Sequence, residues 1–453
     1  MESVIIAGGG LAGSEAAWQI AERGISVVLY EMRPARRTPA HKTGSLAELV
    51  CSNSLKSNVP GAAPWLLKEE LRRAGSLLLR VADANAVPGG AALAVDRERF
   101  SAAVTAAIEG HPSIEVRREE LREIPAGALV VMASGPLTSD ALACYLQKLT
   151  GAHNLAFYDS ISPIVDAETL RMEHIFRASR YGKGGEDYLN CPLMESEYRA
   201  FYDALRAAES AETHPFEDAR YFEACLPIEE LARRGYDTLR FGPMKPVGLK
   251  DPRTGKQPYA VVQLRPENLR FSSYNLVGFQ NHLRFPDQKR ALRLIPGLEG
   301  AEFLRYGQIH RNTYLNAPRL LLPNLSLQAR PDVFIAGQLS GVEGYVESIS
   351  TGYLAGLATA NRSLGAPYEP PPRATALGSL VHFITHADPG NYQPTNISFD
   401  LLPPLEGIPR HIMRNRTARR EMQCEAALSA LEGWLEGIAG VGACSMGSQE
   451  FVF

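Results

Sequence analysis

The first 31 residues contain two short apolar runs separated by a glycine-rich turn and an amphipathic stretch. Residues 3–7 and 27–30 are the apolar runs, and each predicts a strand. Between them, apolar residues recur at three- and four-residue spacings from Leu11, which predicts a helix, and Gly24 ends it. The order strand, turn, helix, strand predicts a Rossmann-type unit.

Later apolar runs extend this plan. They predict a helix over 66–80, a helix within 93–109 that follows Ala94-Val95-Asp96-Arg97, strands at 114–116, 129–132 and 333–335, and a last helix with Ser350 to Ala360 along it. The strand at 129–132 runs into Ala133-Ser134-Gly135, where many flavoproteins of the glutathione-reductase fold carry Ala-Thr-Gly.

The stretch from about 151 to 325 differs, because its apolar runs are short and aromatic residues are frequent. The alternating strands and helices outside this stretch predict an α/β protein. A glutathione-reductase-like FAD-binding Rossmann domain is formed by residues 1–150 and 326–453, the second part including a C-terminal helical region. An inserted α+β substrate domain is formed by residues 151–325.

The turn after the first strand reads G-x-G-x-x-G and has a defined chemistry. Gly8 permits the tight turn, Gly10 lets the backbone approach a pyrophosphate, and Gly13 lets the helix pack on the strand. The helix start offers free N–H groups to phosphates, and Glu31 can accept from a ribose hydroxyl. An acid at this position favours FAD or NAD over NADP.

Composition narrows the class of protein. The chain has 453 residues, is 45% hydrophobic and has a formal charge of −3, so it fits a globular enzyme and shows no overall basic signal for nucleic acid. No apolar run approaches the ~18 residues of a membrane span, and no secretion signal is visible. We expect a cytoplasmic protein. The six cysteines have no zinc-type spacing, and we predict no metal site.

Two cysteines lie where a thiol could be activated. Small polar residues surround Cys51, which suits a loop or a helix start, and Lys56 or a helix dipole would lower the thiol pKa. Cys225 directly precedes a predicted helix that begins near Pro227, a placement that stabilises a thiolate. In both cases the alternative is an inert buried cysteine.

No second dinucleotide motif is convincing, because neither a strand nor a helix flanks the glycines at 182–185. If NAD(P)H is used, we expect it to dock on the flavin. Near His310, an arginine, an asparagine and two tyrosines indicate either ligand contact or ordinary structure. Five arginines crowd a predicted helix between 410 and 420, which is either a solvated face or a phosphate-contact patch.

Several longer stretches carry a family resemblance. The most specific are Val50-Cys51-Ser52-Asn53-Ser54-Leu55-Lys56-Ser57-Asn58 and Phe241-Gly242-Pro243-Met244-Lys245-Pro246-Val247-Gly248-Leu249, and the others are 8–17, 30–34, 310–314 and 336–348. Together they resemble the bacterial folate- and FAD-dependent tRNA (uracil-5-)-methyltransferases over almost the whole chain.

The resemblance implies a reaction and a set of residues. 5,10-Methylenetetrahydrofolate donates a one-carbon unit, FAD reduced by NADPH or NADH supplies reducing equivalents, and the product is 5-methyluridine in the tRNA T-loop. Cys51 and Cys225 are jointly implied as nucleophile and helper, His310 as a folate-stacking residue, and Tyr345 as a candidate for the flavin face or the base. The implied cofactor-binding residues are Gly8, Gly10, Gly13, Glu31, Gly337, Gln338, Gly341 and Gly344.

Two departures and three alternatives accompany this interpretation. Gln338 stands where the glutathione-reductase fold has aspartate, and Asp400 stands where the family has glycine. The alternatives are a longer, related flavoprotein that modifies wobble uridines, a flavin-bound tRNA-binding factor, and an NAD(P)H oxidase of small molecules. The Cys-Ser-Asn-Ser stretch favours methyl transfer. No obligate protein partner is expected.

Overall fold

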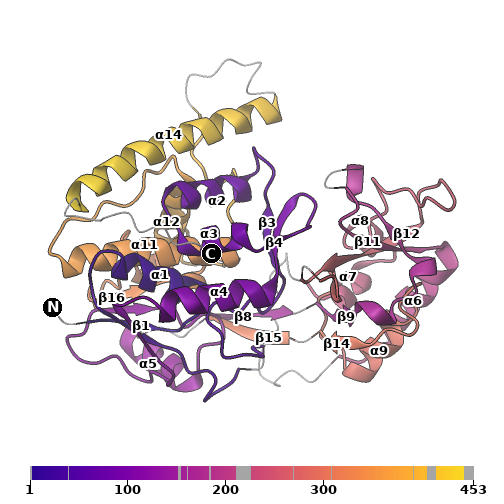
Figure 1. Ribbon diagram of the computed structural model, residues 1–453, viewed down its shortest axis with the longest axis horizontal. Coiled ribbons are helices and arrows are strands. Elements are labelled where there is room, and N and C mark those ends of the chain that lie inside the picture. Colours follow the sequence, from indigo (N-terminus) through magenta and orange to yellow (C-terminus); the bar gives the residue numbers. More distant parts are fainter. Residues whose placement is uncertain are drawn as a thin grey trace.

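The protein is described from a computed structural model that covers residues 3–38, 40–151, 155–160, 162–182, 185–210, 226–268, 270–307, 309–390, 392–405 and 415–442. For residues 155–160, 309–312 and 439–442 only the backbone is described. The chain forms a first unit around a parallel sheet and a second unit around an antiparallel sheet, which lies to the right in Figure 1.

The parallel sheet combines strands from both ends of the chain. Its order is β16-β7-β1-β2-β6, and every neighbouring pair is parallel. The strands are β1 (Val4–Ala7), β2 (Val27–Tyr30), β6 (Ile114–Arg117), β7 (Val130–Met132) and β16 (Val333–Ile335). The predicted helices that follow β1 and β16 are α1 (Leu11–Ala21) and α11 (Tyr345–Ser363). These two helices pack together closely, because Gly352 and Gly356 lie against the backbone of Ala12 and Ala16.

Further elements surround this sheet. The predicted helix over 66–80 is two helices, because Gly75 adopts φ +76° and the Ser76 hydroxyl then accepts from the Leu79 N–H to begin the second one. The additional elements are α2 (Ala63–Arg73), α3 (Leu77–Ala84), α4 (Arg97–Glu109), α5 (Asp140–Thr150), α10 (Ala317–Leu320), α12 (Ala376–His386), α14 (Arg416–Gly442), the short helix η5 (Gly337–Ser340), and a small antiparallel sheet of β3 (Ser54–Ser57), β5 (Ala92–Val95) and β4 (Ala86–Val87).

The second unit has an antiparallel sheet in the order β10-β11-β12-β13-β9-β14. Its strands are β9 (Ile164–Asp166), β10 (Phe176–Arg177), β11 (Leu189–Leu193), β12 (Ala260–Pro266), β13 (Ser273–Leu276) and β14 (Phe303–Arg305). Its helices are α6 (Glu195–Ala207), α7 (Ile228–Arg234), α8 (Thr238–Phe241) and α9 (Phe285–Leu292), with short turns η1 (Ala167–Thr169), η2 (Met172–His174) and η3 (Arg180–Gly182).

Each unit has its own hydrophobic core. The first core draws on residues 4–146 and 314–434, whereas the second draws on the continuous stretch 165–301. A two-stranded antiparallel ribbon of β8 (Leu155–Ser160) and β15 (Ile309–Tyr314) lies where the chain passes between them. This confirms the predicted α/β class with an inserted α+β unit, while the domain limits at 150 and 325 stay predictions. Among the described helices, none is long and apolar enough to cross a membrane.

Candidate functional site

The glycine turn between β1 and α1 has the geometry that its sequence requires. Gly8 adopts φ +105°, and a side chain there would meet the carbonyl oxygen of Ala133 at 2.6 Å. A side chain at Gly13 would overlap the carbonyl oxygen of Gly8, so α1 packs on β1 only with glycine at this position. Gly10 is different, because no protein atom lies within 4 Å of the place of its missing Cβ. The space beside Gly10 therefore belongs to a cavity.

The cavity has a volume of about 390 Å³ and lies where the parallel strands end, as is usual for ligand sites in such sheets. Gly8 and Gly10 line it on one side, and Cys51 and Tyr345 line it on another. Other lining residues include Glu31, His41, Glu48, Lys56, Ser134, Gly337, Gln338, Gly344 and Ser348. Gly13 and Gly341 are not lining residues.

Glu31, which directly follows β2, is buried, and its carboxylate accepts several hydrogen bonds. Its carboxylate accepts from the Gly9 N–H (3.0 Å) and from three groups of Arg33: the backbone N–H (3.0 Å), Nε (2.9 Å) and Nη2 (3.0 Å). Burial alone would raise the pKa of Glu31, but the hydrogen bonds and charge of Arg33 outweigh it and lower the pKa. A ribose hydroxyl would have to share these oxygens with Arg33. The sequence analysis missed this ion pair, although the Glu-x-Arg spacing could have indicated it.

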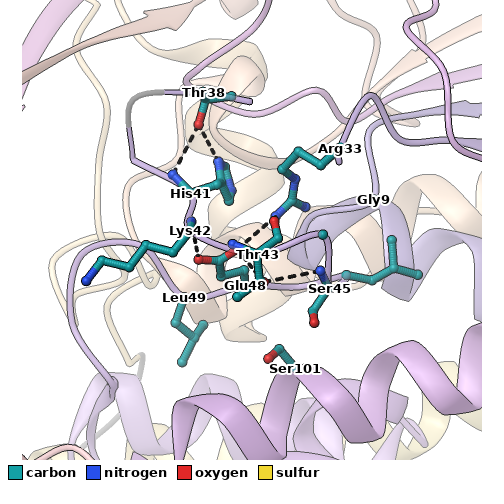
Figure 2. Close-up of polar contacts among 12 residues, drawn as sticks. Gly9, Arg33, Thr38, His41, Lys42, Thr43, Ser45, Glu48, Leu49 and Ser101 are labelled. Carbon is teal, nitrogen blue, oxygen red and sulfur yellow. Dashed lines mark hydrogen bonds and ion pairs between the residues drawn. The ribbon is translucent and has the colours of Figure 1, made fainter. Parts of the chain in front are cut away.

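The loop after β2 is organised around Glu48, as Figure 2 shows. Glu48 accepts from Arg33 Nη1 (3.1 Å), from the Lys42 N–H (2.8 Å) and from the N–H and hydroxyl of Thr43 (3.1 and 2.8 Å). His41 Nδ1 lies 2.6 Å from the Thr38 hydroxyl. Burial and the nearby Arg33 charge lower the pKa of His41 to about 4, so its imidazole is neutral at neutral pH. The loop after β2 is thus a folded wall of the cavity.

The chain between β16 and α11 forms the opposite wall. Gly337 and Gly344 have positive φ values and line the cavity together with Gln338, whose amide donates to Glu343 Oε2. Gly341 also has a positive φ, and a side chain there would overlap the ring of Tyr392, so packing requires glycine at this position. A contact of Gly341 with the cofactor stays a prediction. The α11 helix begins at Tyr345, next to the cavity.

Of the two settings that the sequence left open for Cys51, a loop or a helix start, the structure has the loop. The residue lies in a bend before β3, which pairs with β5, a strand from a later part of the chain. The ammonium of Lys56 is held by Glu347 Oε1 (2.7 Å), Asn396 Oδ1 (2.5 Å) and the Glu343 carbonyl (3.3 Å). Lys56 is thus anchored to α11 and its surroundings.

Tyr345 contacts the Cys51 segment directly. Its phenol oxygen accepts from the backbone N–H groups of Cys51 (2.7 Å) and Ser52 (3.1 Å). Burial, together with the nearby Cys51, raises the pKa of Tyr345, so the phenol is protonated at neutral pH. On the other side, Arg97 Nη2 donates to the Cys51 carbonyl at 3.3 Å. Half-buried Cys51 is therefore fixed at the cavity wall by contacts from α11 and α4.

Two of the predicted site residues lie wholly or partly outside the described residues. Cys225 is outside the described residues, and α7 begins at Ile228 shortly after it. His310 belongs to β15, where it pairs with Asp159, and its side chain is not among those described. The structure thus brings together Cys51, Tyr345 and the glycine turn. Within the described part of the chain, no group of three or more potential metal ligands exists.

Comparison with known proteins identifies the family. Residues 3–367 match the family model described as "Glucose inhibited division protein A". A protein of Solibacter usitatus is 60% identical over 438 residues, 96% of this chain and 98% of that protein, and one of Koribacter versatilis is 59% identical over 431 residues, 95% and 97%. Both are named "Methylenetetrahydrofolate--tRNA-(uracil-5-)-methyltransferase TrmFO". The chain belongs to the TrmFO family. The family predicted from sequence is confirmed.

Solved structures support the fold of this TrmFO family member. Two crystal forms of Aquifex aeolicus GidA superpose with TM-scores of 0.69 and 0.68 at 16% and 17% identity. They cover 96% and 97% of this chain, and the match spans 74% and 79% of the GidA chains. At this level of identity the likeness establishes the fold, including the inserted unit, and nothing about the chemistry.

Proposed function

We propose that this protein methylates C5 of uridine in the T-loop of tRNA, with 5,10-methylenetetrahydrofolate as the one-carbon donor, FAD as the cofactor and NADPH or NADH as the reductant. The observation that carries the proposal is the placement of Cys51 in the wall of the same cavity as the glycine turn. Relatives at 54–60% identity whose printed name contains this donor, tRNA and uracil C5 support it.

The residues of the cavity fit FAD. The space beside Gly10 would be filled by a side chain, and the α1 start has no side-chain cap, so its N–H groups suit a pyrophosphate. Glu31 would hold the ribose, and Gly337, Gln338 and Gly344 would face the flavin side. When bound and reduced by NADPH or NADH, FAD would supply hydride for reduction of the methylene group to methyl.

Uracil C5 is a poor nucleophile and has to be activated. A thiolate that adds to C6 forms a C–S bond and moves the C5–C6 electron pair to the C4 oxygen, after which C5 can attack an electrophilic methylene carbon. A base then removes the C5 proton as the C–N bond to tetrahydrofolate breaks and tetrahydrofolate leaves. Addition of a hydride converts the methylene group to methyl, and expulsion of the thiolate restores the C5–C6 double bond. We assign the thiol roles jointly to Cys51 and Cys225.

Tyr345 is the second residue of this chain that we place in the reaction. Its phenol holds the Cys51 and Ser52 N–H groups, so it orients the thiol segment. A phenol with a raised pKa keeps its proton at neutral pH. Tyr345 could therefore pass that proton to the substrate only if a second proton transfer occurred in the same step.

The test uses flavin-loaded protein, an unmodified tRNA transcript, donor labelled in its methylene carbon and NADPH. We expect donor-dependent label in 5-methyluridine, with a loss of at least about 1,000-fold in Cys51→Ala and Cys225→Ala while the flavin spectrum persists. Cys144→Ala is the matched control, because Cys144 is exposed on α5 and should leave activity unchanged. Flavin-loaded wild type that binds tRNA but transfers no label would overturn the proposal and favour the wobble-uridine enzyme or the binding factor.

A further inference from the structure

The segment that carries Cys51 is attached to the inserted unit through Asn53. This side chain is fully buried, and its amide nitrogen donates to the carbonyl of Val95 (3.0 Å) and to that of Pro266 (2.9 Å). Its amide oxygen accepts from Arg265 Nε at 2.9 Å. Pro266 ends β12, so a single amide joins the cysteine segment to a strand of the second unit.

Arg97 makes a second connection of the same kind. It is the first residue of α4, and its guanidinium donates to the carbonyls of Leu49 and Cys51, which flank Val50. The remaining donors form a bidentate ion pair with Glu267, the residue after β12. The Arg97 and Glu267 side chains are 15% and 5% exposed, so the pair is shielded from water. A lysine could not span the carboxylate and both carbonyls, because it has one ammonium and no fork.

These contacts hold both peptide groups of Cys51. Tyr345 accepts from its N–H and from that of Ser52, while Arg97 donates to the carbonyl between them. With the backbone held from opposite sides, the direction of the sulfur depends mainly on rotation about one side-chain bond. Arg305, from β14, is the further cation whose charge acts on Cys51 and Tyr345.

We infer that Arg97 is a positioning residue for the Cys51 thiol and that Glu267, supplied by the inserted unit, fixes the orientation of Arg97. The inference rests on the proposed function, in which Cys51 takes part in the chemistry. It gives the inserted unit a part in the site, because the end of β12 determines where the thiol stands relative to the cavity. A shift of that strand on substrate binding would move the thiol with it.

The kinetic test compares Arg97→Lys and Glu267→Gln with Arg330→Lys. Arg330 is the matched control. It forms a bidentate ion pair with Asp332 just before β16, which is an edge strand of the parallel sheet. We expect kcat for methyl transfer to fall about 100-fold in Arg97→Lys, because small misplacements of reacting groups cost about that factor, and about 10-fold in Glu267→Gln. KM for tRNA and for the donor should change less than threefold, and the control less than twofold. Arg97→Lys with kcat within threefold of wild type would overturn the inference.

A second measurement decides the inference even if no methyl transfer occurs. Alkylation by iodoacetamide is followed peptide by peptide, and the rate at Cys51 is divided by the rate at exposed Cys144 in the same sample. Release of the segment should expose the half-buried thiol and raise this ratio at least fivefold in Arg97→Lys and Glu267→Gln, with no change in Arg330→Lys. A ratio that stays within twofold in Arg97→Lys would overturn the inference. A ratio that falls would also overturn it, because it would mean that Arg97 acts by stabilising the negative charge of the thiolate.

Discussion

The two units of the molecule bury polar groups in different ways. In the first unit, buried carboxylates cap helix starts: Glu15 accepts from the N–H groups of Leu77 and Leu78 at α3 (3.3 and 3.0 Å), and Glu70 accepts from two N–H groups at α12 (2.7 and 2.9 Å). In the second unit, the buried carboxylate of Glu229 accepts from the N–H of His282 in a loop (2.6 Å), and buried tyrosines lie in a cluster of packed aromatic rings. Tyr198 donates to the carbonyl of Tyr236, and their rings pack edge to face.

The contrast separates a unit built around helix starts from one built around aromatic packing. Helix starts leave several N–H groups without partners, and in the first unit Glu15 and Glu70 satisfy two sets of them. The α1 start has no such carboxylate and lies beside the cavity. The aromatic cluster of Tyr198, Tyr202 and Tyr236 belongs to the second core and does not line the cavity, which fits a unit whose part in the site is to hold Arg97 and Asn53 in place.

The largest effect on the first unit is expected from substitutions in the glycine turn. Gly13→Ala should destabilise the fold by about 3 kcal/mol or more, because the new methyl overlaps the Gly8 carbonyl, although alanine normally stabilises a helix interior. Gly10→Ala should leave stability within about 0.5 kcal/mol but weaken flavin binding at least tenfold by filling the phosphate space. Thermal melts and flavin retained after dialysis measure both. A stable Gly13→Ala protein would contradict the packing argument.

Glu70 should give the first unit a pH dependence. Burial raises the pKa of Glu70 to about 8, above its ordinary 4.5, so between these values the folded state keeps a proton that the unfolded state has lost. Stability contributed by Glu70 therefore falls as pH rises through that window. Burial also lowers the pKa of Lys68 to about 7, which raises stability only above pH 7. Other buried groups, such as His41 and Glu229, change stability between pH 5 and 7, so the part of Glu70 is obtained as the difference from a variant that keeps them.

The measurement is denaturant unfolding of the wild type and Glu70→Gln at pH 5, 6 and 7. The wild type should lose about 2 kcal/mol more than the variant across this range, because glutamine does not titrate. Parallel pH profiles for the two proteins would show that Glu70 stays ionised at its helix start.

The smallest effect is expected in the second unit. Tyr198→Phe removes one buried hydroxyl and leaves the carbonyl of Tyr236 without that donor, which should cost about 1 kcal/mol. Flavin content should stay unchanged, since the residue lies in the other core. Tyr181→Phe is the control, because this tyrosine is 64% exposed and should be neutral. A loss of flavin in Tyr198→Phe would mean that the two cores are not separate.

The sequence predicted what depends on near neighbours. The glycine turn, its flanking strands and the acid at Glu31 could be identified because tight turns require glycine at set positions. The setting of Cys51 stayed open between a loop and a helix start because small polar residues suit both, and pairing of β3 with β5 decides between them. The contact of Arg97 with Glu267 joins residues 170 positions apart, and no local pattern indicates it.

The tight contact of Gly352 with Ala12 has a consequence for synthesis on the ribosome. Helix α1 is made before the inserted unit, yet the helix it packs against leaves the ribosome only after all of that unit. At ~5–20 residues per second the wait is roughly 20–70 s. During that time the apolar side of α1 lacks its final cover, while the inserted unit, being continuous, can complete its own core. A segment made before the inserted unit therefore reaches its final packing only after that unit has been made.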